Sequence, residues 1–164
     1  MSNLPDWLPD LLLLEDFGGN WQRYEDEVYA VFYGDFIQTK PSFEGKPVFI
    51  KRELTKGKER SFWHCIQEGF EEEARTPDLR RCERIKWIRA IIDHADDPNI
   101  KNWLNIRKGK TRQVLWLENA EFLVVLENRP SVWVLWTAYP VTESRRKEKL
   151  RREYEEYLKK PTPP

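Results

Sequence analysis

The chain has 164 residues, of which 40% are apolar and 34% charged, and its formal net charge at pH 7 is zero. This composition, with eight tryptophans and eight phenylalanines, describes one soluble globular domain with an aromatic-rich core. The two cysteines, Cys65 and Cys82, fit neither a metal-ligand spacing nor a disulfide framework, so we expect a reducing, cytoplasmic location. The four leucines at 11–14 are too few for a signal sequence and are flanked by acids, so we expect that nothing here directs export or membrane insertion.

The zero net charge hides an asymmetry along the chain. Residues 1–45 hold nine acidic residues against two basic ones, so the rest of the chain carries an excess of seven positive charges. We expect residues 1–20 to form an acidic, loosely packed leader and the basic remainder to attract phosphate groups. The leader could then shield part of the basic surface.

The first predicted helix follows this leader. Apolar residues recur at steps of three and four from Trp21 to Phe32, which predicts a helix with Asn20 as its N-cap. The segments KPVFIKREL (46–54) and RSFWHCIQ (60–67) are interpreted as two strands joined by the hairpin turn TKGK.

A second helix is predicted over 76–95, with Thr76 as N-cap and Pro77 at the first helical position. Four strands joined by short turns follow, at about 102–107, 111–118, 121–127 and 132–139. A last helix is predicted from about residue 142, with Leu150, Tyr154, Tyr157 and Leu158 on its buried face.

These elements predict an α+β fold, in which N-terminal helices precede a four-stranded antiparallel meander that a C-terminal helix covers. The predicted organisation is a leader (1–20), a single α+β domain (21–160) and a short tail (161–164).

The last predicted strand becomes polar only at its end. Strict alternation places Thr137 and Tyr139 on one face with Trp133 and Leu135, and Pro140 ends the ladder. We expect the two hydroxyls to emerge at the edge of a cleft and meet a ligand there. The alternative is that both are ordinary residues of a strand at the rim of a core.

The two histidines differ in their predicted surroundings. His64 shares a predicted strand face with Phe62 and Ile66, where burial requires that its imidazole be hydrogen-bonded. Both a core histidine and a general acid or base are open for this residue. His94 stands at the end of the second predicted helix, where we expect it to cap that helix.

Basic residues supply candidates for phosphate binding. Arg112 opens a strand whose same face carries Val114 and Trp116, where a guanidinium could hold a phosphate through two hydrogen bonds. The other candidates for substrate binding are Lys51, Arg81, Arg84, Arg107 and Lys110. The chain contains no Gly-rich phosphate loop, G-x-S-x-G, H-E-x-x-H or Cys-x-x-Cys motif, so we expect neither a cofactor nor a metal.

Three segments together resemble a known group of nucleases. FWHCIQEG, the arginine-rich RRCERIKWIRAII and the strand ending in WTAYPV are similar to phage-encoded branches of the barnase, EndoU, colicin and RelE-like nuclease superfamily. The resemblance covers about residues 28–158. It implies helices followed by a four-stranded antiparallel sheet, and a toxin-like endoribonuclease from a phage or mobile element.

The resemblance also implies a mechanism and partners. Metal-independent cleavage proceeds by attack of the ribose 2′-hydroxyl on the adjacent phosphate, which leaves a 2′,3′-cyclic phosphate. His64 would be the acid or base, Arg84 or Arg112 the phosphate clamp, and Thr137 and Tyr139 the hydroxyl pair. The implied partners are RNA, such as tRNA, and an inhibitor or immunity protein. The chain departs from the many members that place a histidine or lysine in the final strands.

Two other functions remain open from the sequence. A non-catalytic protein on the same scaffold would bind nucleic acid or an acidic protein through its basic surface, without turnover. Transfer of ADP-ribose from NAD is suggested only by His64 and Tyr139, and no glutamate completes such a site.

Overall fold

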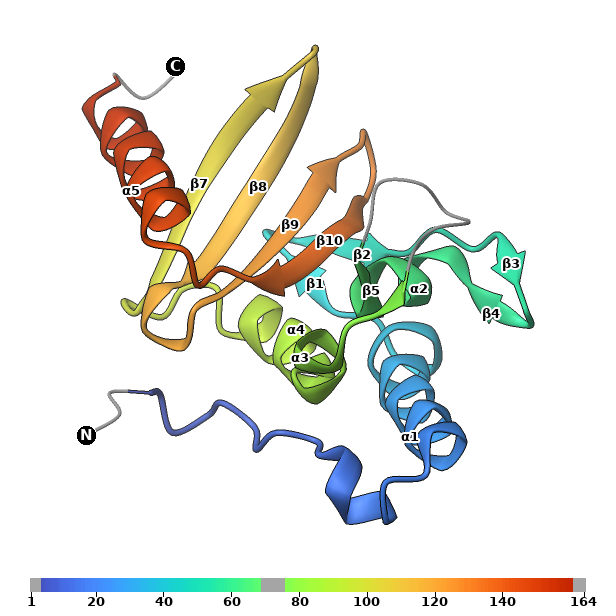
Figure 1. Cartoon of the computed structure of the whole chain (residues 1–164). Helices are drawn as coiled ribbons and strands as arrows, with labels where there is room; N and C mark the ends of the chain where they lie inside the picture. The colour runs from blue at the N-terminus through green and yellow to red at the C-terminus, as the bar shows by residue number, and fades with distance from the viewer. Residues whose placement is uncertain (1–3, 69–75, 161–164) are drawn as a thin grey trace.

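A computed structural model of the chain describes residues 4–68 and 76–160, except the side chains of Glu68 and Arg107 (Figure 1). The α-helices of this part are α1 (Trp21–Tyr33), α2 (Arg60–Ile66), α3 (Leu79–Glu83), α4 (Ile85–Asp93) and α5 (Ser144–Lys159). The strands of the main sheet are β1 (Ser42–Phe43), β2 (Lys46–Phe49), β7 (Ile100–Arg107), β8 (Lys110–Leu117), β9 (Phe122–Asn128) and β10 (Trp133–Pro140).

Short elements complete the described part. Two small hairpins pair β3 (Leu54–Thr55) with β4 (Lys58–Glu59), and β5 (Gln67–Glu68) with β6 (Thr76–Pro77). One-turn helices span Leu14–Phe17 and Glu118–Ala120, and a π-helical turn over Gly34–Gln38 extends α1.

The fold is α+β, but the sheet is larger than we predicted. It has six strands among the described residues, in the order β1-β2-β10-β9-β8-β7, where we expected four. Consecutive strands from β7 to β10 pair antiparallel, whereas β2 pairs parallel to β10, with Val48 opposite Trp133. The parallel pair brings the segment after β2 beside the middle of β10, although the two are more than 80 residues apart in the chain.

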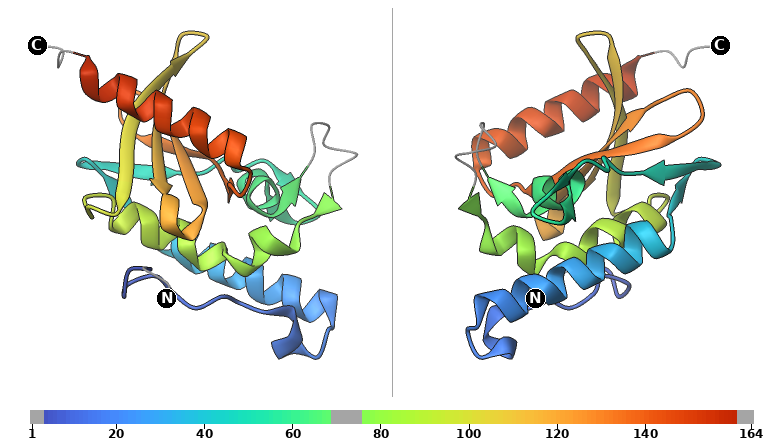
Figure 2. Two further views of the ribbon diagram at one scale, coloured as in Figure 1. Left: turned by 60° about the vertical axis from the view of Figure 1, so that its left-hand side comes forward. Right: turned by 90° about the vertical axis from the view of Figure 1, so that its right-hand side faces the viewer.

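Helices cover both faces of the sheet, and the sheet separates two hydrophobic cores (Figure 2). On one face α2 and α3 pack against β10, and α4 packs against β8 and β9. On the other face α5 lies against β7 and closes a smaller core. This smaller core consists of Trp103, Val114, Trp116, Leu123, Val125, Val141 and Leu150.

Residues 60–66 are helical, so the strand predicted over 60–67 is wrong. All of Ser61, Phe62, Trp63, Cys65 and Ile66 are buried in α2, and only part of the His64 side chain reaches the surface. A short segment that is apolar all round shows no period, because nearly every side chain has a buried position. His64 therefore projects from a helix that packs against β10.

Two other helices differ from the prediction. The helix expected over 76–95 is divided at Arg84 into α3 and α4, and its N-cap is Asp78, whose carboxylate accepts from the Arg80 N–H at 2.9 Å. Thr76 and Pro77 instead form β6, because Thr76 pairs with Glu68 of β5. In α5 only Leu150 is buried, while Tyr157 and Leu158 are exposed and were wrongly assigned to the buried face.

A β-bulge interrupts β10 at Trp136. Leu135 is opposite Leu126 and Thr137 is opposite Val125, so Trp136 has no partner in the ladder. The extra residue shifts the alternation by one. Trp133, Leu135 and Ala138 belong to the larger core, whereas Trp136 and Tyr139 pack against the smaller one. The prediction that Thr137 and Tyr139 share a face with Trp133 and Leu135 is therefore wrong.

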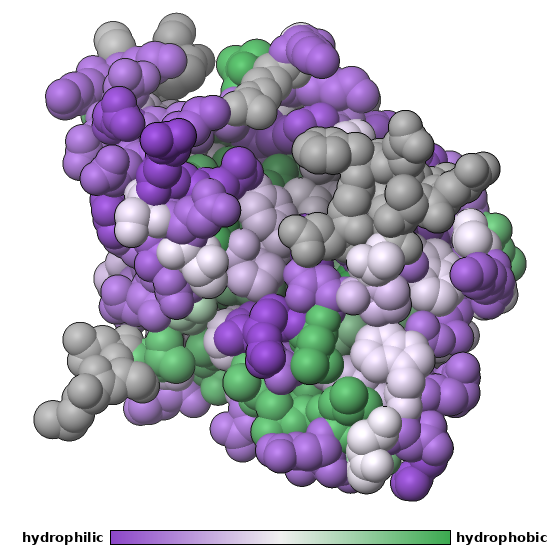
Figure 3. Space-filling model, in the orientation of Figure 1, coloured by the Kyte–Doolittle hydropathy of each residue, from purple (hydrophilic) through white to green (hydrophobic). Residues whose placement is uncertain are grey.

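The described residues of the N-terminal segment lie along α3 and α4. The Leu12 N–H donates to the Glu83 carbonyl at 2.9 Å, and the Trp87 indole donates to the Pro9 carbonyl at 2.7 Å. Its leucines and aromatic residues pack against the larger core, so the segment is not loosely packed. Apolar side chains are visible where this segment lies, at the bottom of Figure 3, whereas the region of α5 is mostly hydrophilic.

Candidate functional site

Three cations surround the unpaired tryptophan of the bulge. The Lys51 ammonium lies 3.6 Å from the centre of the Trp136 ring, the Arg112 guanidinium 4.3 Å and the Lys110 ammonium 5.6 Å. Lys51 follows β2, and the parallel pairing places it beside β10, while Lys110 and Arg112 open β8. The electron-rich ring attracts all three cations, and it thereby concentrates positive charge on one face of the sheet. We call Lys51, Lys110, Arg112 and Trp136 the tryptophan cluster.

His64 contacts this cluster through Lys51. The Nζ of Lys51 lies 3.5 Å from the Nδ1 of His64, at the limit of a hydrogen bond. Burial, with a smaller contribution from the charge of Arg60, lowers the pKa of Lys51 to about 8. The structure therefore joins an imidazole to an amine that exchanges its proton near neutral pH.

Glu127 carries the negative charge of the cluster. It is 3% exposed, and its carboxylate lies 3.7 Å from Arg112 and 2.9 Å from Arg129. One buried carboxylate thus faces two guanidinium groups, with Lys51 and Lys110 close by, and the surplus charge is positive. A surplus of this sign attracts phosphate.

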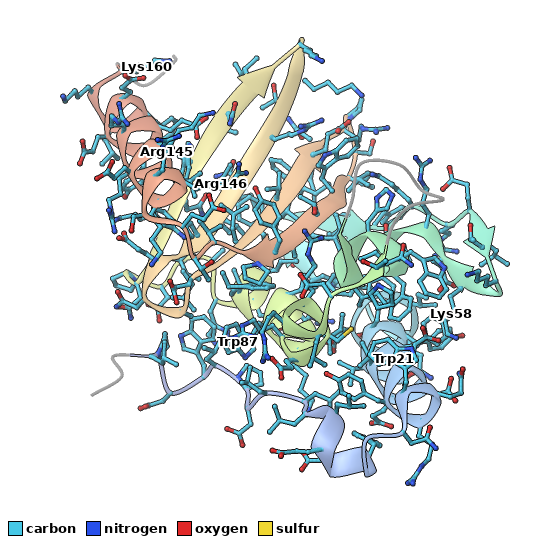
Figure 4. All side chains as sticks on the ribbon, viewed as in Figure 1. Trp21, Lys58, Trp87, Arg145, Arg146 and Lys160 are labelled. Atoms are coloured by element: carbon cyan, nitrogen blue, oxygen red, sulfur yellow. The ribbon has the colours of Figure 1, made fainter. Side chains whose placement is uncertain are left out.

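A second group of cations surrounds Tyr139, further along β10. The Tyr139 hydroxyl accepts from Nη2 of Arg146 at 2.5 Å, and the Arg146 guanidinium lies 5.3 Å from the ring centre. The Arg81 guanidinium lies 5.6 Å from the same ring and donates to the Gln67 carbonyl at 2.7 Å. Arg145 and Arg146 project from the first turn of α5 (Figure 4). This tyrosine cluster consists of Tyr139, Arg81 and Arg146.

A groove of about 270 Å³ between the sheet and α5 lies between the two clusters. Apolar side chains of β8 and β9 line it together with Trp136, Thr137 and Tyr139 of β10, while Arg146, Lys149 and Glu153 come from α5. Asn105 donates to Glu153 across the groove at 2.6 Å. The groove thus has an apolar lining, polar groups on its walls and basic side chains at its ends.

Most of the candidates from the sequence lie in or beside this groove. Arg112, Thr137 and Tyr139 line it, and Lys51 and Lys110 contact the Trp136 ring. Arg81 and His64 lie beside it, because Arg81 contacts Tyr139 and also donates to the His64 carbonyl at 3.3 Å.

Among the other basic residues considered in the sequence, Arg84 and His94 do not reach this site. Arg84 lies beside Glu83 and Trp87, on the side of the molecule where the N-terminal segment packs. The side chain of Arg107 lies outside the described part. His94 stacks on Trp7 with 4.3 Å between ring centres, and its Nδ1 is 2.8 Å from the Ala90 carbonyl.

Sequence reasoning missed Trp136, Glu127 and Arg146. The period-two pattern assigned Trp136 to a buried face, and only the bulge turns it toward the cations. Glu127 could have been found, because two neighbouring antiparallel strands place it beside Arg112. Arg146 was not singled out from the many charged residues of the last predicted helix.

Three further features were considered for the described residues: a reactive thiol, a cluster of metal ligands and a membrane-spanning helix. Burial raises the pKa of the Cys65 thiol to about 12, so its nucleophilic thiolate does not form near neutral pH. Among residues 4–68 and 76–160, no three His, Cys, Asp or Glu side chains lie close enough together to hold a metal ion. No helix within the same ranges has the length and apolar character needed to cross a bilayer.

Comparisons with known proteins give no further guide to this site. No protein-family model matches the chain, and neither the curated proteins nor the solved structures contain a match.

Proposed function

We propose that the protein is a metal-independent endoribonuclease whose reaction takes place beside the Lys51–His64 pair. The observation that supports this proposal best is the 3.5 Å contact between Lys51 Nζ and His64 Nδ1 at the edge of the tryptophan cluster. There an imidazole and an amine whose pKa is lowered to about 8 adjoin several other cations. Cleavage of RNA by its own 2′-hydroxyl requires this combination.

The reaction assigns one role to each group. His64 takes the proton of the 2′-hydroxyl while the 2′-oxygen forms a bond to phosphorus, and the bond from phosphorus to the 5′-oxygen breaks. Lys51, protonated below about pH 8, gives a proton to the departing 5′-oxygen. Arg112 and Lys110 stabilise the negative charge on the phosphorane, and the products are a 2′,3′-cyclic phosphate and a 5′-hydroxyl.

The resemblance seen in the sequence supports the same proposal. It implies a toxin-like ribonuclease of phage or mobile-element origin, which acts on cytoplasmic RNA and is held in check by an inhibitor protein. A non-catalytic RNA-binding protein is the competing function, because a cationic groove needs no proton transfer to bind phosphate.

The test is incubation of the purified protein with total RNA in EDTA, followed by mapping of the new ends. We expect wild type to leave 2′,3′-cyclic phosphates, and His64→Ala and Lys51→Met each to lose at least about a hundredfold in rate, as general acid or base groups do. Arg23→Ala is the matched control, because Arg23 is exposed on α1.

The competing outcomes are distinct. Salt-sensitive RNA binding without any cleavage would replace the proposal with the binding function. Cleavage that survives both substitutions would place the reaction elsewhere in the molecule.

A further inference from the structure

The tyrosine cluster carries positive charge that the proposed reaction does not use. Among the described residues, no carboxylate lies within ion-pair distance of Arg146 or Lys149, and both line the groove. Arg81 adds a third cation, although Asp78 lies 3.4 Å from its Nε. Glu153 is the one carboxylate among the described residues that line the groove, against three cations, and this surplus of positive charge favours an anionic ligand.

The two clusters are separated by a fixed spacing along one strand. Trp136 and Tyr139 are three residues apart on β10, which corresponds to about 10 Å or less with the bulge between them. The groove lies between them, so a ligand that reaches both ends must pass along the groove. A polymeric ligand that carries one negative charge in each repeating unit could place one charge at each of the two cationic clusters.

The interior of the groove differs from its ends. Val114, Leu123 and Val125 supply an apolar lining, while Asn105 and Thr137 supply hydrogen-bonding groups. A flat, apolar ring with polar edges, which is what a nucleobase offers, is the complementary shape. In a duplex the faces of a base are covered by stacking, so a base whose ring packs on this apolar lining must be unpaired and unstacked.

We propose that Arg146 and Lys149 form a second phosphate subsite, and that the groove holds one unpaired base of single-stranded RNA between this subsite and the tryptophan cluster. This inference rests on the proposed function for the identity of the ligand as RNA. It adds the substrate class, a single strand, and names the residues that bind the phosphate beyond the one that is cleaved.

A binding measurement separates this inference from the cleavage reaction. Full-length His64→Ala protein is titrated with a fluorescent single-stranded RNA oligonucleotide, and with the same sequence as a duplex, over a range of salt concentrations. We expect the single strand to bind at least about tenfold tighter than the duplex. Adding Arg146→Ala and Lys149→Ala removes the contacts to one phosphate, so the slope of log K against log salt should become shallower by about 0.7.

The control is Arg152→Ala in the same background, because Arg152 is exposed on α5 and does not line this groove. Thermal unfolding of each variant verifies that it is folded, and Arg146→Lys, which keeps the charge, is expected to retain the salt slope. Equal slopes for the double variant and the Arg152→Ala control would overturn the subsite. Equal affinity for single strand and duplex would overturn the substrate class.

A kinetic comparison adds a readout in the active protein. Arg146→Ala with Lys149→Ala is expected to raise KM for an oligonucleotide and to leave KM for a dinucleotide unchanged, because a dinucleotide has only one phosphate. If no RNA is cleaved but the binding results hold, the cleavage proposal fails and the subsite stands. If the double variant cleaves RNA and its KM equals that of wild type for both the oligonucleotide and the dinucleotide, the subsite is contradicted and the cleavage proposal stands.

Discussion

At the scale of single residues, Lys51 is the group whose ionisation matters most. Its half-buried ammonium lies between the Trp136 ring and His64, and its pKa is lowered to about 8. Because the proposed role needs the protonated form, we expect kcat/KM for RNA to fall as pH rises through 8. In Lys51→Arg, whose guanidinium stays charged, any remaining activity should lack this alkaline limb in a pH–rate profile. An unchanged limb in this variant would assign the ionisation to another group.

The same ionisation affects stability. The folded-state pKa of Lys51 lies below the value of 10.5 for an unfolded lysine, so burial of its charge costs free energy below about pH 8. This cost is relieved as pH rises from about 8 to 10.5, where the unfolded chain binds more protons than the folded one. We therefore expect the stability advantage of Lys51→Met over wild type to shrink across this window in urea titrations. An advantage that stays constant with pH would contradict the lowered pKa.

Glu127 is expected to stabilise the fold and to weaken RNA binding. Its buried carboxylate faces Arg112 and Arg129, and its removal leaves the Nε of Arg112, which has no hydrogen-bond partner, further from any negative charge. We expect Glu127→Gln to lower the free energy of unfolding by roughly 1.5–3 kcal/mol, the range for a hydrogen bond to a charged group. The same change raises the positive potential of the groove, so RNA should bind more tightly at low salt. Glu153→Gln removes a negative charge from the opposite wall of the groove, on α5, and serves as the comparison for the effect of Glu127→Gln on RNA affinity.

At the scale of elements, the last four strands were predictable, and the other strands and the irregularities that form the site were not. The last four strands were predicted to within about two residues, because alternating apolar residues and short turns fix both their type and their limits. Helix α2 was mistaken for a strand, because a segment buried on all sides loses its period. The bulge at Trp136 has no signal in a single sequence, since it depends on how β10 pairs with β9.

The bulge gives a prediction about deletions. Removing Trp136 restores regular alternation and leaves Leu135, Ala138 and Tyr139 on their present faces. We expect this deletion variant to fold cooperatively, with a loss of roughly 1–3 kcal/mol of packing, and to bind RNA poorly because the cations lose their ring. Deletion of Val124 from β9, whose register with β8 is unbroken, moves Val125 and Leu126 to each other's faces and should prevent folding. Circular dichroism and urea titration distinguish the two variants, and a folded Val124 deletion would contradict the assigned register.

At the scale of the whole molecule, the acidic N-terminal segment and the groove lie on different sides. The described part of the segment contacts α3, α4 and the larger core, whereas α5 lies on the other side of the sheet (Figure 2). The groove is formed between the sheet and α5. The segment therefore acts as a part of the core and not as a shield over the tryptophan cluster.

Truncation tests this assignment. Removal of residues 1–20 takes several half-buried leucines and aromatic residues from the larger core. Since 1 kcal/mol corresponds to about 2–4 °C for a chain of this size, we expect Tm to fall by roughly 10 °C or more. RNA affinity of the folded fraction should stay the same within about twofold when it is measured well below Tm. An increase in affinity on truncation would restore the shielding hypothesis.

The parallel pair of β2 and β10 has a consequence for the newly made chain. Lys51 and His64 leave the ribosome long before residues 133–140, yet the contacts to the Trp136 ring need both segments. Pairings so distant in sequence form late, because a long loop must close first. The tryptophan cluster is therefore assembled only after β10 has left the ribosome, and an incomplete chain that stops before β10 carries the charges without the site.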